Sequence, residues 1–191
     1  MRKLSILAVC LFVVGSASAQ KFKKGSIDFL KGQSKVNVVF DFTKITIDGD
    51  SEESYIKERM ADEKTSEEAE RWKDEWFGAH RTQFMNTFIK YCNDELKDLQ
   101  VSKTEDATYT IVVKIEDIDP GNFGGPFSNP SKLKAAIKIV KTSDMNTALA
   151  DLLLKNIFNP WGAQPVEYMR IEMAFGELGK TLAKQLNNGL K

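Results

Sequence analysis

Two stretches of alternating residues constrain the fold of this chain more than any other feature. In residues 108–119, and again in residues 132–141, apolar side chains alternate with polar or charged ones, as in Tyr109-Thr110-Ile111. A period of two puts the apolar side chains on one face of a strand, and such clean alternation is typical of an antiparallel sheet with one face in water. A polar turn at residues 142–146 predicts that a third strand, residues 147–155, returns as a hairpin partner.

Two amphipathic segments can cover the apolar face of that sheet. Residues 67–99 carry apolar side chains at three- to four-residue spacing, and Thr65-Ser66-Glu67-Glu68 before them is a capping-box start. The expected stripe consists of Trp72, Trp76, Phe77, Phe84, Phe88, Cys92 and Leu96. A final helix over about residues 166–188 is expected to bury Met169, Met173, Leu178, Leu182 and Leu186, with Gly189 just past its end as a stop.

One more strand is expected near the start, over residues 35–48. Val36, Val38, Phe40 and Phe42 alternate onto one face, whereas Ile45 and Ile47 have the opposite parity. This change of phase predicts a bulge or bend near Thr43 and Lys44. We therefore predict a two-layer α+β fold, with about four mainly antiparallel strands and both helices on one face of the sheet. Residues 51–64 should hold only a short helical turn.

The first nineteen residues read as a signal peptide. Arg2 and Lys3 precede an apolar run over residues 6–14, which is shorter than the roughly 20 residues that span a bilayer. Ala17-Ser18-Ala19 has the small-x-small pattern of a cleavage site. We expect cleavage after Ala19 and export to the periplasm or the exterior. The mature chain would then hold a flexible arm over residues 20–34 and a single domain over residues 35–191.

Charge and cysteine content exclude several classes of protein. The chain has 27 basic and 27 acidic residues, and the leader removes two of the basic ones. A near-neutral domain has no overall attraction to nucleic acid or anionic lipid, and no later stretch is long enough to span a membrane. Cys10 lies in the leader, so Cys92 is left without an internal disulfide partner and is expected to be a buried, inert thiol.

The chain has few groups suited to catalysis or metal binding. His80 is the only histidine, and we interpret it as a packing residue of the long helix, because a metal site needs several clustered ligands. The acidic turn from Asp48 to Glu53 lacks the glycine and glutamate spacing of a calcium loop, and no G-x-S-x-G elbow is present. Asp117 and Asp119 are read as ordinary strand-end acids. We expect no catalytic residues, no metal and no cofactor.

The loop after residue 119 is the most interesting candidate for function. Phe123 and Phe127 flank the segment Gly124-Gly125-Pro126, and Trp161 lies in a second turn, Asn159-Pro160-Trp161-Gly162. These three aromatic residues either cap the edge of the core or are exposed anchors for a partner. The polar sheet face with Lys114, Glu116, Lys134 and Lys138 is interpreted as solvated, with weak cross-strand ion pairs.

The strand at residues 107–115, the glycine-rich loop, the strand at residues 134–141 and the closing helix resemble a known layout. Exported bacterial envelope domains similar to the N-terminal domain of TolB, and CsgG-like domains, share it. Secreted proteins of Bacteroidetes-type bacteria carry a loop similar to Asp119-Pro120-Gly121-Asn122-Phe123-Gly124-Gly125. The resemblance implies a docking module, although this chain lacks a good lipobox.

Two hypotheses for function follow. The first is a non-enzymatic envelope protein that docks an unknown envelope partner, with Phe123, Phe127 and Trp161 as the contact residues. The second is a ligand-binding protein or a hydrolase that acts on envelope polymers or lipids. A deep pocket beneath the Gly/Pro loop would favour the second class, because such proteins need a concave site with converging polar groups.

Overall fold

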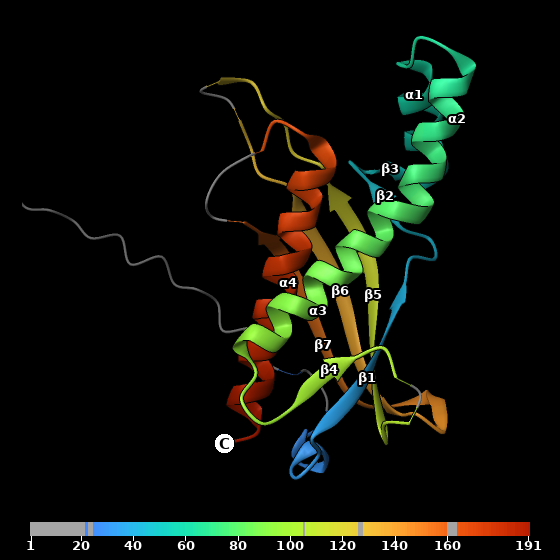
Figure 1. Cartoon of the computed structure of the whole chain (residues 1–191). Helices are drawn as coiled ribbons and strands as arrows, with labels where there is room; N and C mark the ends of the chain where they lie inside the picture. The colour runs from blue at the N-terminus through green and yellow to red at the C-terminus, as the bar shows by residue number, and fades with distance from the viewer. Residues whose placement is uncertain (1–21, 23–24, 105, 126–127, 160–163) are drawn as a thin grey trace, which may run out of the picture.

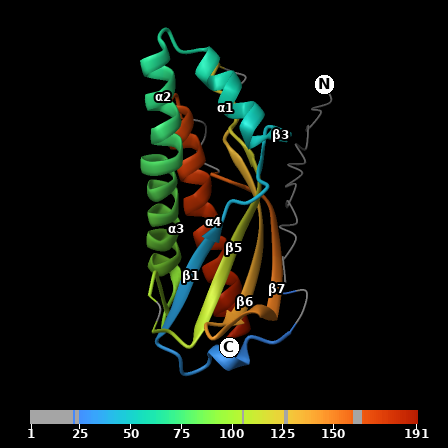
Figure 2. The same ribbon diagram turned by 90° about the vertical axis from the view of Figure 1, so that its right-hand side faces the viewer.

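The computed structural model describes residue 22 and residues 25–104, 106–125, 128–159 and 164–191. In this part of the chain, one mixed sheet carries two long helical segments on one face (Figures 1 and 2). The predicted α+β class and the two-layer arrangement are therefore confirmed. The sheet has seven described strands rather than about four, because the expected first strand is divided at its bend into residues 35–41 and 46–47, and two short strands at residues 50–51 and 100–102 were not expected.

Strand β5 lies at the centre of the sheet. Strands β5, β6 and β7 form an antiparallel meander, while β1 pairs with β5 in parallel and lies between β5 and β4. The strands are β1 (Lys35–Asp41), β2 (Thr46–Ile47), β3 (Asp50–Ser51), β4 (Gln100–Ser102), β5 (Tyr109–Asp119), β6 (Lys132–Lys141) and β7 (Asp144–Phe158). The expected antiparallel pairing is thus confirmed for β5, β6 and β7, whereas the first strand, β1, pairs in parallel.

The predicted change of phase in the first strand is present. Lys44 has a φ of 58°, and this left-handed residue separates β1 from β2. Beyond it, β2 pairs with the far end of β5, where Ile47 lies opposite Ile118. The bend therefore lets one segment of chain follow β5 along both halves of its length, with Val38 and Ile47 both buried.

The long N-terminal helical region is divided into four parts. They are α1 (Glu52–Ala61), α2 (Ser66–Glu75), the π-helical turn η2 (Trp76–His80) and α3 (Arg81–Glu95). The capping box is confirmed, because the Thr65 hydroxyl accepts a hydrogen bond of 3.2 Å from the Glu68 backbone N–H. The expected short turn is a full ten-residue helix, α1, which with α2 extends beyond the end of the sheet (Figures 1 and 2).

The π-helical turn corrects one member of the predicted stripe. A π turn holds one more residue than an α turn, so it shifts the helical phase. As a result Trp76, Phe84 and Phe88 are all buried, whereas Phe77 is 45% exposed. The expectation that Phe77 faces the sheet was wrong for this reason.

The C-terminal helix α4 (Glu167–Gly189) crosses the apolar face of the sheet beside α3 (Figure 1). Leu178, Leu182 and Leu186 are buried as predicted, but Met169 is 39% exposed and Met173 is half-buried. In the first turns the buried positions are instead Arg170, Ile171, Ala174 and Phe175. Gly189 is the last residue of the helix rather than the first residue beyond it.

Part of the predicted N-terminal arm is packed against the domain. The 3₁₀ turn η1 (Asp28–Leu30) buries Leu30, and Ile27 is also buried. Ile27 lies against the end of α4. A Cβ built at Gly189 would be only 2.7 Å from the Ile27 side chain. Residues 25–34 are therefore part of the domain rather than a loose arm, and the expected domain start at residue 35 is too late.

The outer face of the sheet is polar, as the alternation predicts. Lys114 and Lys134 are half-buried and Lys138 is exposed, and Lys134 forms an ion pair of 2.9 Å with Glu116. The Glu116 carboxylate raises the pKa of Lys134 through this contact. Within the described residues, no helix combines the length and the apolarity that a bilayer crossing requires.

Candidate functional site

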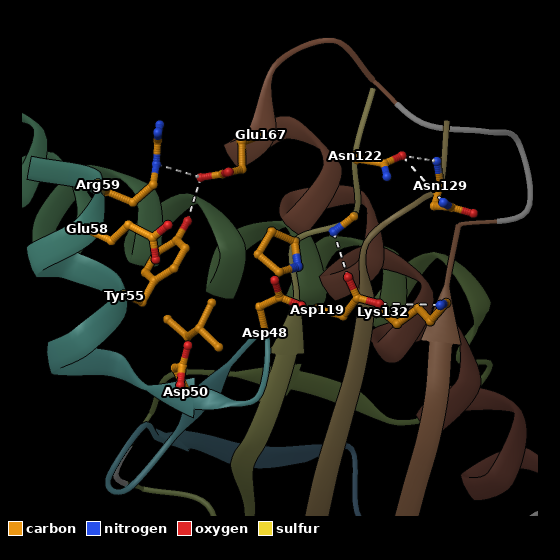
Figure 3. A pocket seen from close by; sticks show the side chains of 13 residues that line it. Asp48, Asp50, Tyr55, Glu58, Arg59, Asp119, Asn122, Asn129, Lys132 and Glu167 are labelled. Carbon is orange, nitrogen blue, oxygen red and sulfur yellow. Dashed lines mark hydrogen bonds and ion pairs between the residues drawn. The ribbon is translucent and has the colours of Figure 1, made fainter. Parts of the chain in front are cut away.

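A polar cleft of about 470 Å³ lies at the end of the sheet where β5 stops and β6 starts (Figure 3). Its lining comes from four separate parts of the chain: the β2–β3 turn, α1, the segments around the β5–β6 loop, and the first turn of α4. The lining residues are Ile47, Asp48, Asp50, Tyr55, Glu58, Arg59, Asp119, Pro120, Gly121, Asn122, Asn129, Lys132 and Glu167. The cleft thus lies beneath the base of the Gly/Pro loop.

Helix α1 forms one wall and is linked to α4 through a single carboxylate. The Tyr55 hydroxyl donates a hydrogen bond of 2.5 Å to Glu167, and the Arg59 Nε lies 3.6 Å from the same carboxylate. Burial, followed by the Glu167 charge, raises the pKa of Tyr55 above its usual value. Burial acts to lower the pKa of Arg59, but the charges of Glu167, Tyr55 and Asp62 together outweigh burial, so the pKa is raised. Tyr55 therefore stays a neutral donor at physiological pH.

The opposite wall is the base of the β5–β6 loop. Asp119 accepts a hydrogen bond of 2.8 Å from the Gly121 backbone N–H and forms an ion pair of 3.3 Å with Lys132. The Asn122 and Asn129 backbones bond each other across the loop. Gly121 has a φ of 65°, and a Cβ there would lie 2.4 Å from the Asn129 carbonyl oxygen. Only glycine fits this closely packed base.

The cleft carries an excess of negative charge. Five carboxylates line it, against the two cationic side chains of Arg59 and Lys132. Both cations are already paired with carboxylates, whereas Asp48, Asp50 and Glu58 form no ion pair with another described residue. Because these three side chains are solvent-exposed, they can attract a cationic group without a prior desolvation cost.

The predicted contact residues lie next to this cleft or outside the described residues. Phe123 follows the cleft residue Asn122 directly and is 54% exposed, so it does not cap the core. Phe127 and Trp161 fall outside the described residues. The acidic turn expected to be unremarkable supplies Asp48 and Asp50 to the cleft, and the strand-end acid Asp119 lies on its other side.

Two further predictions are confirmed. Cys92 is buried, and burial raises the pKa of its thiol to about 12. His80 is half-buried and stacks on Tyr168, with ring centroids 4.5 Å apart. Burial lowers the pKa of His80, an effect that the charges of Glu75 and Glu167 oppose. Both residues pack helices together, as the sequence indicated.

Most residues of the cleft were not predicted from the sequence. Tyr55, Glu58 and Arg59 lie in a segment where only a short charged turn was expected, and Glu167 and Arg170 lie in a helix read for its apolar stripe. The signal that could have found the first three was helical spacing, because Tyr55, Glu58 and Arg59 share one face at intervals of three and four residues. For Glu167 and Arg170, no local pattern indicates a role.

The lining side chains of the cleft are mainly carboxylates and amides, with two cations and one tyrosine hydroxyl. Among its described lining residues there is no serine, threonine, cysteine or histidine, the side chains that most often serve as nucleophile or as the base that activates one. Within the described parts of the chain, no three histidine, cysteine or acidic residues cluster as a metal site would need. What the cleft offers is hydrogen-bond acceptors, fixed donors and uncompensated negative charge.

Fold and cleft together define an α+β module with a polar recess at one end of its sheet. No protein-family model matches the chain, and no curated protein matches it. Among solved structures, the PelC dodecamer from Paraburkholderia phytofirmans aligns with 83% of this chain and 93% of its own chain, at 7% identity and a TM-score of 0.34. A single-substitution variant of that dodecamer aligns with 78% of this chain and 86% of its own, at 11% identity and a TM-score of 0.29.

Neither likeness carries an argument about this chain at such TM-scores. The expected similarity to TolB-type and CsgG-like envelope domains stays a prediction, since no comparison tests it.

Proposed function

We propose that the protein is an exported, non-enzymatic docking module of the cell envelope, and that its partner presents a cationic segment to the cleft. One observation carries the proposal: three exposed carboxylates that form no ion pair with another described residue converge on a recess built from four parts of the chain. The leader-like residues 1–19 support export. The exposed Phe123, beside the recess, supplies an apolar anchor of the kind that dominates binding energy at protein interfaces.

The polarity of the lining favours a protein partner over a small apolar ligand. Pockets for small molecules are lined mostly by hydrophobic and aromatic side chains. Here the lining is largely charged or amide-bearing, and Ile47 and Pro120 are its main apolar members. A polar recess flanked by one exposed aromatic residue resembles the mixed polar and apolar character of a protein–protein contact.

Site-specific crosslinking in native envelopes tests the docking site. A photoreactive phenylalanine analogue is placed at position 123 and, as the matched control, at position 145. Met145 is equally an exposed apolar residue, 45% accessible, but lies in the hairpin at the opposite end of the sheet. The proposal predicts a crosslinked species at position 123 and none at position 145. Equal crosslinking at both positions would refute a docking site at the cleft.

A charge test addresses the partner's chemistry. Binding of a hexalysine peptide is measured by calorimetry for the wild type, for the triple variant Asp48→Asn, Asp50→Asn, Glu58→Gln, and for Asp98→Asn. Asp98 is an exposed carboxylate beyond the opposite end of the sheet. Each exposed ion pair contributes about 0.2–1 kcal/mol, so the triple variant should bind about tenfold more weakly, and less so at high salt. Equal losses in the triple variant and in Asp98→Asn would refute a cationic partner.

The second candidate, a ligand-binding protein or hydrolase acting on envelope polymers or lipids, is favoured by the position of the cleft. A recess of about 470 Å³ beneath the Gly/Pro loop is within the usual size range of ligand sites. Incubation with cell-wall glycan or phospholipid vesicles tests it, with new reducing ends or free fatty acids as the readout. Turnover that Asp119→Asn or Glu167→Gln abolishes would replace the docking proposal by this one.

A further inference from the structure

Arg170 is a buried arginine whose hydrogen bonds all go to backbone carbonyls. The residue is 7% exposed. Its Nε donates to the Pro120 carbonyl at 2.9 Å, and one terminal nitrogen donates to the Gly121 carbonyl at 3.3 Å. The other terminal nitrogen donates to the carbonyls of Gln164 and Pro165, at 2.8 and 3.1 Å. A buried charge is costly unless it is well compensated, so such an arrangement needs a reason.

The four carbonyls belong to the two segments that bring α4 and the loop to the cleft. Pro120 and Gly121 line the cleft directly. Gln164 and Pro165 precede Val166, the N-cap of α4, and the first residue of that helix, Glu167, contacts Tyr55 and Arg59 of the α1 wall. Arg170 therefore connects the base of the β5–β6 loop to the segment before α4, which positions Glu167.

The loop held in this way has a closely packed base and an exposed tip. Gly121 packs against Asn129 with no room for a side chain, and the Ser131 hydroxyl donates a hydrogen bond of 2.7 Å to the Asp119 carbonyl. Two residues further along the chain, Phe123 is exposed. The Phe123 side chain at the tip can keep one orientation only if the backbone at the base of the loop also keeps one conformation.

We propose that Arg170 is a positioning residue for the docking site, a role that rests on the proposed function. Arg170 does not contact the partner; it holds the backbones of Pro120–Gly121 and Gln164–Pro165 so that Phe123 and Glu167 are arranged before the partner arrives. Such preorganisation reduces the entropy lost on binding. The planar guanidinium can reach both backbone segments at once, whereas a lysine ammonium acts as a single point charge.

Hydrogen exchange of the mature chain tests this role without any ligand. The reporters are the Asn122 and Asn129 amides, which bond across the loop, and the reference is the Val113 amide of β5. In Arg170→Met the loop amides should exchange about tenfold faster than in the wild type while Val113 is unchanged. Arg170→Lys should give a smaller acceleration, because it retains one of the contacts. No acceleration at the loop, or the same acceleration at Val113, would overturn the proposal.

A matched control separates positioning from general stability. Arg81 is another largely buried arginine; it pairs with Glu52 and lies over the rings of Phe42 and Phe77. Arg81→Met should lower the melting temperature without selective exchange at Asn122 and Asn129. Selective loop exchange in Arg81→Met would also overturn the assignment.

Binding then distinguishes this inference from the proposed function. Crosslinking from position 123 and hexalysine binding are repeated in Arg170→Lys, which retains the charge. Weaker binding together with faster loop exchange supports the positioning role. If the wild type crosslinks nothing and binds no peptide, while the loop amides respond as described, the docking proposal fails and the structural part of the inference stands.

Discussion

Replacing Gly179 by alanine is a sharp test of how α3 and α4 pack on the sheet. Gly179 is fully buried in the middle of α4, and a Cβ there would lie 2.3 Å from the Phe88 carbonyl oxygen and 3.1 Å from the Cys92 backbone nitrogen. Gly78, in the π-helical turn, is the matched control, because a Cβ at that position meets nothing within 4 Å.

The magnitude follows from two opposing effects. Alanine is about 1 kcal/mol better than glycine in a helix interior, whereas overpacking a core costs about 1–3 kcal/mol. A carbon and a carbonyl oxygen normally stay about 3.3 Å or more apart, so the helices would have to separate by about 1 Å. The obstacle is backbone and cannot rotate away, so we take the overpacking cost at the top of its range, about 3 kcal/mol, which less the gain of about 1 kcal/mol leaves a net destabilisation of about 2 kcal/mol. In a domain of this size that lowers the melting temperature by about 4–8 °C.

Thermal and urea unfolding, followed by circular dichroism, measure both variants. Gly179→Ala should unfold at a lower temperature, and Gly78→Ala at the same or a slightly higher temperature than the wild type. Gly176→Ala should lie between them, because its Cβ would meet the Tyr91 ring at 3.2 Å and a ring can move. A Gly179→Ala variant as stable as Gly78→Ala would refute the close contact between the two helices.

Three further predictions concern the cleft wall and the core. Tyr55→Phe removes the hydroxyl that bonds Glu167 and should lower the free energy of unfolding by about 1.5–3 kcal/mol in urea titrations. Because the folded-state pKa of Tyr55 is raised, the wild type should also lose stability as the pH rises above 10.0, and Tyr55→Phe should lose less. The same loss of stability above pH 10.0 in both proteins would contradict this. Burial lowers the pKa of His80 in the folded state, so the free energy of unfolding should decrease as the pH falls below 6.5. In His80→Gln this decrease should be smaller. Cys92 should resist iodoacetamide in the native protein and react once urea unfolds it; rapid native labelling would show that the thiol is not buried.

The sequence predicted those features that depend on neighbours along the chain. Alternation at residues 108–119 and 132–141 marked β5 and β6 nearly to the residue, since a strand with one face in water needs a period of two. Thr65 and Glu68 marked the start of α2, because a helix leaves its first N–H groups without partners. The change of parity between Phe42 and Ile45 located the bend at Lys44.

Other features depend on contacts between distant parts of the chain. Phe77 satisfies a helical stripe in the sequence, yet it is exposed, because the π-helical turn shifts the phase of the helix. The parallel pairing of β1 with β5 is equally invisible in either strand alone.

The cleft shows the same division between local and tertiary information. From the sequence alone came the α+β class and the buried thiol, while the export signal stays a prediction; whether Phe123 caps the core or is exposed was left open. Only the folded chain decided that Asp48, Glu58, Asp119 and Glu167 share one recess, since they come from four segments separated by as much as 119 residues in the chain. Local pattern determines which face of an element is apolar, but long-range packing determines which elements meet, and a site made between elements exists only after they have met.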